Sequence, residues 1–228
     1  MRTNKQTARI AGIYYLFVGI FGGFSEGFVD PKMYAGDAAA AAGNVVAHPG
    51  LVRLSVVAHL LDAIFFILTA LTLYTLLQHV HKSVARAMLV FVALAVGIIT
   101  LNAVFQFEAL RVATDASYAT AFGAAGANAL VLLLLDIQHY GTLSAQVFFG
   151  LWLAPLGYLA YKSGMFSKPL GVILVAATVC YLVHLFAAFL LPDLAPHLRP
   201  AIVIVPTIAE VWMVFYLLIV GVRTDSHV

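Results

Sequence analysis

The chain has 228 residues, of which 63% are hydrophobic and only 10% are charged, and its mean hydropathy of +1.01 excludes a soluble globular domain and indicates a polytopic membrane protein. The formal net charge of +2 comes from basic residues spread along the chain, so no patch for binding nucleic acid is predicted. The single cysteine, Cys180, excludes both an intrachain disulfide and a CxxC motif.

Six apolar runs are long enough to cross a hydrocarbon core of about 30 Å, which takes about 20 helical residues. Backbone groups in lipid must be satisfied within the segment, and the runs lack the alternation of barrel strands, so all six should be helical. The predicted fold class is therefore all-α, with a six-helix bundle forming a single transmembrane domain over residues 1–228. The runs cover residues 10–29, 53–78, 84–112, 128–161, 169–191 and 200–221.

The connection after the first run predicts a short interfacial helix. Asp37 precedes an alanine run in the position of an N-cap, and Pro49 and Gly50 resemble a helix stop. A competing interpretation takes the basic start, the first apolar run and this alanine-rich stretch as a cleavable signal peptide. Further along, Pro155 predicts a kink in the fourth run, which exceeds the minimum span.

The basic residues in the short connections predict the orientation of the helices. Eight lie on one side of the predicted membrane and four on the other, which places both termini in the cytoplasm. The eight are Arg2, Lys5, Arg9, Lys82, Arg86, Lys162, Lys168 and Arg223, and the four are Lys32, Arg53, Arg111 and Arg199.

Several stretches resemble the bacterial membrane family described as domain of unknown function 4386. They include RIAGIYYLFVGIFG, LDAIFFILTALTLYTLLQHV and YLVHLFAAFLLP, and the most specific is FFGLWLAPLGYLAYKSGMFSKPLG. The similarity runs from about residue 9 to about residue 221. It implies a six-helix protein of the bacterial cytoplasmic (inner) membrane, and it assigns no catalytic residue.

Half of the ten acidic residues fall inside the predicted spans, all in the outer half of the membrane. They are Glu26, Asp62, Glu108, Asp136 and Glu210, and His59, His139 and His184 lie at similar depth. Asp30 lies in or beside the first outer connection. A charge at the centre of a span costs at least about 2.5 to 3.5 kcal/mol, so this polar layer predicts a function.

The spacing of these residues suggests a metal site. His59 and Asp62 are three residues apart, as are Asp136 and His139, so each pair shares a helix face. Metal sites in helical bundles use a carboxylate and a histidine at this spacing, and such ligands suit zinc, iron or manganese. The predicted metal ligands are His59, Asp62, Glu108, Asp136, His139, His184 and Glu210, of which Asp136, His139 and Glu210 are also the predicted catalytic groups.

Local explanations compete with this hypothesis for some residues. Glu108 is three residues before Arg111, a spacing that also predicts a salt bridge. His184 follows Tyr181 by three residues. This spacing also suits a histidine that is held in the protein core by a hydrogen bond. Asn102 and Gln106 share a face, which is typical of hydrogen bonds that join the third and fourth helices.

Three functions from different classes follow from this layer. The first is a metal-dependent enzyme embedded in the bilayer, which acts on a lipid-like small molecule. The second is a proton-linked transporter that uses the same residues as a protonation relay. The third is a haem or quinone redox protein with His59, His139 or His184 as an axial ligand.

Overall fold

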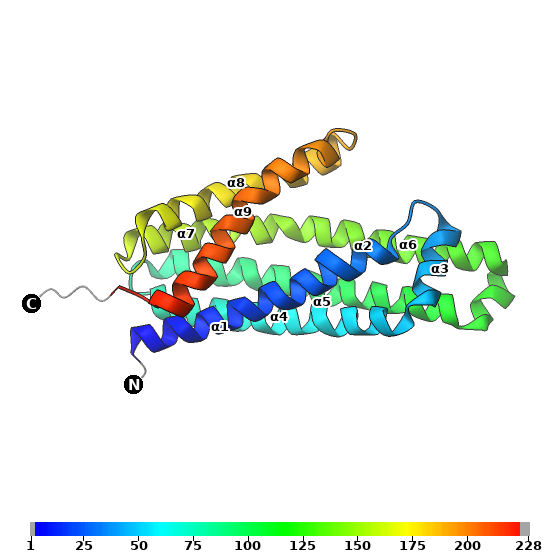
Figure 1. Ribbon diagram of the computed structural model, residues 1–228, viewed down its shortest axis with the longest axis horizontal. Helices are drawn as coiled ribbons and strands as arrows, with labels where there is room; N and C mark the ends of the chain where they lie inside the picture. The colour runs from blue at the N-terminus through cyan, green and yellow to red at the C-terminus, as the bar shows by residue number, and fades with distance from the viewer. Residues whose placement is uncertain (1–2, 224–228) are drawn as a thin grey trace, which may run out of the picture. The chain divides into compact units, whose positions relative to one another are not determined.

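The computed structural model describes residues 3–223, apart from the side chains of residues 196, 198, 199 and 201. Helices and their connections make up this described part, which contains no β-strand, so the predicted all-α class is confirmed (Figure 1). The elements are α1 (Asn4–Gly22), the π-helix η1 (Gly23–Val29), α2 (Asp30–Met33), α3 (Ala38–Ala47), α4 (Pro49–Leu77), α5 (Lys82–Thr114), α6 (Ala116–Leu151), α7 (Leu153–Lys162), α8 (Lys168–Leu190), α9 (Ala195–Phe215) and the π-helix η2 (Tyr216–Val220).

Six helical segments within the described residues are long and apolar enough to cross a membrane, as the sequence predicts. Helices of this length and composition indicate a multi-pass membrane protein. The segments are Asn4–Met33, Pro49–Leu77, Lys82–Thr114, Ala116–Lys162, Lys168–Leu190 and Ile202–Val220.

The fourth segment has 47 residues, about 70 Å if it were one continuous helix, and it is interrupted. α6 ends at Leu151, and α7 begins at Leu153 after a turn at Trp152. Pro155 has no N–H to donate to the carbonyl of Leu151, four residues earlier, so the helix is weakened at that carbonyl. The effect of Pro155 therefore appears one turn before the proline itself.

The predicted short helix in the first outer connection is α3, and Asp37 is its N-cap. The Asp37 carboxylate accepts a hydrogen bond of 2.8 Å from the backbone N–H of Ala40. The helix stop predicted at Pro49 and Gly50 agrees with the end of α3 at Ala47, and Pro49 is also the first residue of α4. Proline fits there since the first N–H of a helix has no partner within the helix.

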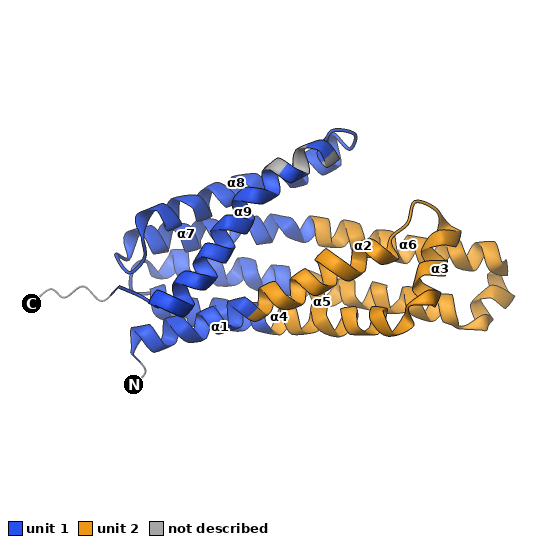
Figure 2. Cartoon of the chain, viewed as in Figure 1, with its two compact units in different colours: residues 1–16, 65–96, 144–228 blue, residues 17–64, 97–143 orange. Residues whose placement is uncertain are grey.

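The chain divides into two compact units, each assembled from separate segments (Figure 2). Unit 1 contains residues 1–16, 65–96 and 144–228, and unit 2 contains residues 17–64 and 97–143. The boundaries fall inside α1, α4, α5 and α6, so each of these four helices contributes to both units. The single transmembrane domain over residues 1–228 stays a prediction.

In unit 1, α7 and α8 pack closely through two glycines. A Cβ atom on Gly157 would lie 2.6 Å from the carbonyl oxygen of Gly171, and one on Gly171 would lie 2.8 Å from the carbonyl oxygen of Gly157. A side chain at either position would overlap the opposite backbone. Small residues allow this approach, which is how helices pack inside membranes.

The core of unit 2 joins the short helices to the long ones. Met33 on α2 and Val45 on α3 are buried against residues of α4, α5 and α6. This packing fixes α2, whose first residue is Asp30. The buried core residues are Val29, Met33, Ala41, Ala42, Val45, Val52, Ala109, Leu110, Val112, Val131 and Leu135.

Candidate functional site

Asp30 is the centre of a polar cluster in unit 2, which we call the Asp30 cluster. Its Oδ1 atom accepts hydrogen bonds from Ser55 Oγ at 3.1 Å and from Gln106 Nε2 at 2.8 Å. Its Oδ2 atom accepts from Gln138 Nε2 at 2.7 Å and is 3.1 Å from His59 Nε2. The four donors come from α4, α5 and α6, so this one carboxylate ties three long helices to α2. Asp30, which the sequence places in or beside the first outer connection, lies at the start of α2 and belongs to this cluster.

The partners of Asp30 are shielded from solvent. His59 is 3% exposed, Gln138 5% and Gln106 1%, whereas the Asp30 side chain is 16% exposed. An ionised carboxylate offers about four lone-pair positions, and four donors face it here. Asp30 is thus a partly buried carboxylate with a complete set of hydrogen-bond partners.

The bond to Asp30 sets the chemical role of His59. Because the carboxylate oxygen can only accept, Nε2 of His59 carries the hydrogen and Nδ1 is left for proton exchange. The negative charges of Asp30, Glu26 and Asp62 all act on this imidazole. A histidine oriented by a buried carboxylate is the arrangement used for acid–base chemistry in enzymes and for proton relays.

The π-helix η1 carries Glu26 and leads directly into α2, whose first residue is Asp30. Its residues Gly23–Val29 separate α1 from α2, and Glu26 lies in its first turn. Ser25 Oγ donates to the carbonyl of Phe21 at 2.8 Å, which satisfies one carbonyl at the change of helix type. π-Helical turns within α-helices occur frequently at functional sites.

A second group in unit 2 contains Asp136 and His139, which the sequence predicts as metal ligands and catalytic groups. Tyr34 Oη donates to Asp136 Oδ1 at 2.5 Å, and the Tyr34 ring stacks on the His139 ring with centroids 5.0 Å apart. Burial and the hydrogen bond to Asp136 raise the pKa of Tyr34 to about 12. The phenol therefore keeps its proton and remains a donor to Asp136.

The other predicted site residues have local partners. Glu108 forms a salt bridge of 2.9 Å with Arg111, the alternative that the spacing favours. In unit 1, Glu210 accepts hydrogen bonds from Tyr15 and Tyr181, and His184 Nδ1 lies 2.9 Å from Gln146 Oε1.

The structure does not gather the seven predicted metal ligands into one group. In unit 2, the Asp62 charge acts on His59, as their spacing predicts, whereas Asp136 and His139 contact Tyr34. Among the described residues, no three His, Cys, Asp or Glu side chains are grouped so that they could hold a metal ion. The physical reason is that tyrosine, arginine and glutamine side chains hold the carboxylates and imidazoles separately.

Three of the four donors of the Asp30 cluster, Ser55, Gln106 and Gln138, are not among the predicted site residues. Ser55 and His59 are four residues apart on α4 and share a face, a spacing that the sequence displays. Gln138 lies between Asp136 and His139, which are predicted site residues because their side chains can carry a charge. Asn102 does join α5 to α6, through a hydrogen bond of 3.2 Å to Thr142, whereas Gln106 reaches Asp30 and Ser55 instead.

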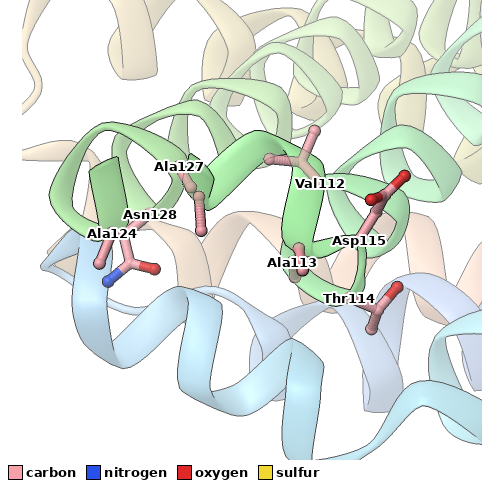
Figure 3. A pocket seen from close by; sticks show the side chains of 9 residues that line it. Val112, Ala113, Thr114, Asp115, Ala124, Ala127 and Asn128 are labelled. Atoms are coloured by element: carbon pink, nitrogen blue, oxygen red, sulfur yellow. The ribbon is translucent and has the colours of Figure 1, made fainter. Parts of the chain in front are cut away.

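A pocket of about 290 Å³ lies at the turn between α5 and α6, also in unit 2 (Figure 3). Small side chains line most of it, with Asp115 and Asn128 among the polar groups. Hydrogen bonds from Ser117 lower the pKa of Asp115, whose carboxylate accepts from the backbone N–H of Ser117 at 2.9 Å. Asp115 thus caps the start of α6, and the pocket lacks the histidine and clustered carboxylates of the Asp30 cluster.

Neither the comparison with curated proteins nor the comparison with solved structures gave a match to this chain. A family model does match, over residues 10–221, which is nearly the whole of the described structure. This result confirms the resemblance seen in the sequence. The chain belongs to the family described as domain of unknown function (DUF4386).

Proposed function

We propose that the protein is a proton-linked transporter in which His59 carries the proton and Asp30 orients it. The observation that supports this proposal is the hydrogen bond of 3.1 Å between His59 Nε2 and Asp30 Oδ2 among membrane-spanning helices. Ionisable groups are costly in a membrane, and those found there commonly serve ion or proton pathways. Histidine is suited to this role because its unperturbed pKa lies near physiological pH.

The surroundings of His59 provide routes for proton exchange. Glu26 on η1 and Asp62 on α4 act on the imidazole, so carboxylates from two elements accompany it. Gln106 Oε1 is buried and has no hydrogen-bond partner within the described residues. A bound solute or water with an N–H or O–H group would satisfy this acceptor, which favours a solute site beside the proton site.

The proposed location is the bacterial cytoplasmic membrane, with both termini in the cytoplasm. The support is the eight-to-four division of basic residues, in which Lys5, Lys82 and Lys168 lie at helix ends on one side. Arg2 lies outside the described residues, as does the side chain of Arg199. The lipid bilayer is the partner that the apolar helix surfaces require.

Solute-coupled proton movement tests the proposal. Proteoliposomes that contain a pH-sensitive dye are challenged with a panel of amines, carboxylates, sugars and amino acids. At least one class should move protons with the wild-type protein, and His59→Gln should abolish that movement. The matched control is His48→Gln, which changes an exposed histidine between α3 and α4.

The same preparations test the metal-dependent enzyme that the sequence suggests. Purification without chelator, followed by elemental analysis, measures bound zinc, iron or manganese. Near-stoichiometric metal that is lost in His59→Ala and in Asp62→Asn, together with no solute-coupled proton movement, would overturn the transporter proposal and favour the enzyme.

A further inference from the structure

Glu210 is a membrane-embedded carboxylate that the Asp30 cluster does not use. It lies on α9, within the candidate span Ile202–Val220. Tyr15 Oη on α1 donates to Glu210 Oε2 at 2.8 Å, and Tyr181 Oη on α8 donates to Oε1 at 2.8 Å. All three residues belong to unit 1. One carboxylate is therefore held by two phenols from two other helices.

No positively charged side chain among the described residues faces Glu210. In the described part of the chain, the titratable groups that face the carboxylate are Tyr15 and Tyr181. On α8, the titratable groups nearest to Tyr181 in sequence are Cys180 and His184, and the Nδ1 atom of His184 is engaged by Gln146 Oε1 at 2.9 Å. Phenols can solvate an anion, but they do not neutralise it. Inside an apolar span, binding of a cation to the Glu210 carboxylate is therefore favourable. The smallest such cation is the proton.

The two phenols can satisfy Glu210 in either charge state. A hydroxyl group is both a donor and an acceptor, and its hydrogen rotates to suit the partner. When Glu210 is ionised, both tyrosines donate to it. When a proton from water binds one carboxylate oxygen, the new O–H donates to the phenol beside it, which turns its own hydrogen away. No helix has to move for this exchange.

The described helices cover Glu210 and Tyr15 to different extents. Glu210 is half-buried, whereas Tyr15 is 2% exposed. The Tyr15 ring is held edge-on against Trp152, with ring centroids 5.4 Å apart. A fixed phenol thus contacts a carboxylate that is partly open.

We propose that Glu210, held between Tyr15 and Tyr181, is a second proton-binding site of this protein. The site does not depend on the transporter proposal, because its residues are separate from His59 and Asp30 and it can be tested without any solute.

Infrared spectroscopy of the intact protein in lipid tests the site. The difference spectrum between about pH 5 and pH 9 should contain the C=O stretching band of a protonated carboxyl group that is hydrogen-bonded to phenols. Glu210→Gln should remove this band. Glu108→Gln is the matched control, since Glu108 is bound to Arg111 on the surface, and it should leave the band in place. His59→Gln should also leave the band, even if it abolishes proton movement, so the two proposals fail separately.

The tyrosine variants give a second readout that does not require Glu210→Gln to fold. In Tyr15→Phe and in Tyr181→Phe the carboxyl group loses one hydrogen-bond partner, so the band should shift to higher frequency. A band that is absent from the wild-type protein, or that survives in Glu210→Gln, would overturn the proposal. A band that stays at the same frequency in both tyrosine variants would also overturn it, because it would belong to another carboxyl group.

Discussion

Asp30 is followed by Pro31, and this pair looks like the start of a loop. In the structure Pro31 is instead the second residue of α2, which continues directly from η1. The Asp30 carboxylate then meets donors that are 25, 29, 76 and 108 residues away in sequence. Such long-range partners leave no periodic signal, and for this reason the residue with the most buried polar contacts was not among the predicted site residues.

Asp30→Asn should destabilise the protein by about 3 kcal/mol, because it leaves buried donors without an anionic acceptor. The measurement is the midpoint of unfolding in detergent. Asp193→Asn is the control, since Asp193 is exposed in the connection before α9, and it should change the midpoint little. Equal midpoints for the two variants would show that the four donors do not depend on the charge of Asp30.

Tyr34 gives a prediction for alkaline pH. Its pKa is about 12 in the folded protein and 10.0 when unperturbed, so folding favours the protonated phenol. The stabilisation is complete below about pH 10 and is lost as the pH rises to about 12. Unfolding measurements across this range should show the loss in the wild-type protein and a smaller loss in Tyr34→Phe. The same alkaline loss in both proteins would contradict the contact with Asp136.

At the scale of single elements, local signals in the sequence are sufficient for much of the fold. The apolar runs predict the six spans, Asp37 predicts the start of α3, and Pro155 predicts the interruption before α7. The π-helix η1 is different, because Gly23–Val29 lies within an apolar run that suits an α-helix equally well. The pairing of Tyr34 with Asp136 joins a connection to the middle of α6, so it depends on packing that no local pattern specifies.

The glycine contact between α7 and α8 gives a test of helix packing. Gly157→Ala should destabilise the protein by about 1 to 3 kcal/mol, because the new Cβ atom would lie 2.6 Å from the Gly171 carbonyl oxygen. Gly19→Ala is the matched control, since a Cβ atom there has no atom within 4 Å. The midpoint of thermal unfolding in detergent compares the two variants. A Gly157→Ala midpoint as high as that of Gly19→Ala would contradict the close contact.

At the scale of the whole molecule, the chain is a multi-pass membrane protein whose polar side chains gather in local groups. Each unit has its own carboxylate site: Asp30 with His59 in unit 2, and Glu210 with two tyrosines in unit 1. Both sites lie among candidate membrane spans. A protein of this kind exposes its charges to water at the connections and keeps a few inside the membrane for function.

The proposed orientation can be tested by cysteine labelling in intact cells, with Cys180→Ala as the background. Thr120→Cys, in the first turns of α6, should react with a membrane-impermeant reagent added outside. His81→Cys, between α4 and α5, should react only after the cells are opened. The reverse pattern would place both termini outside the cytoplasm.

The proposed proton carrier is His59, which Asp30 holds as an imidazole within the membrane. NMR spectroscopy of the protein in lipid, with ¹⁵N-labelled histidine, measures this directly, and His59→Gln assigns the signals. We expect that neutral His59 carries its hydrogen on Nε2, that Nδ1 gains a proton as the pH is lowered, and that Asp30→Asn removes the preference for Nε2. A His59 that holds one protonation state from about pH 5 to pH 9, or whose neutral form carries the hydrogen on Nδ1, would contradict this proposal.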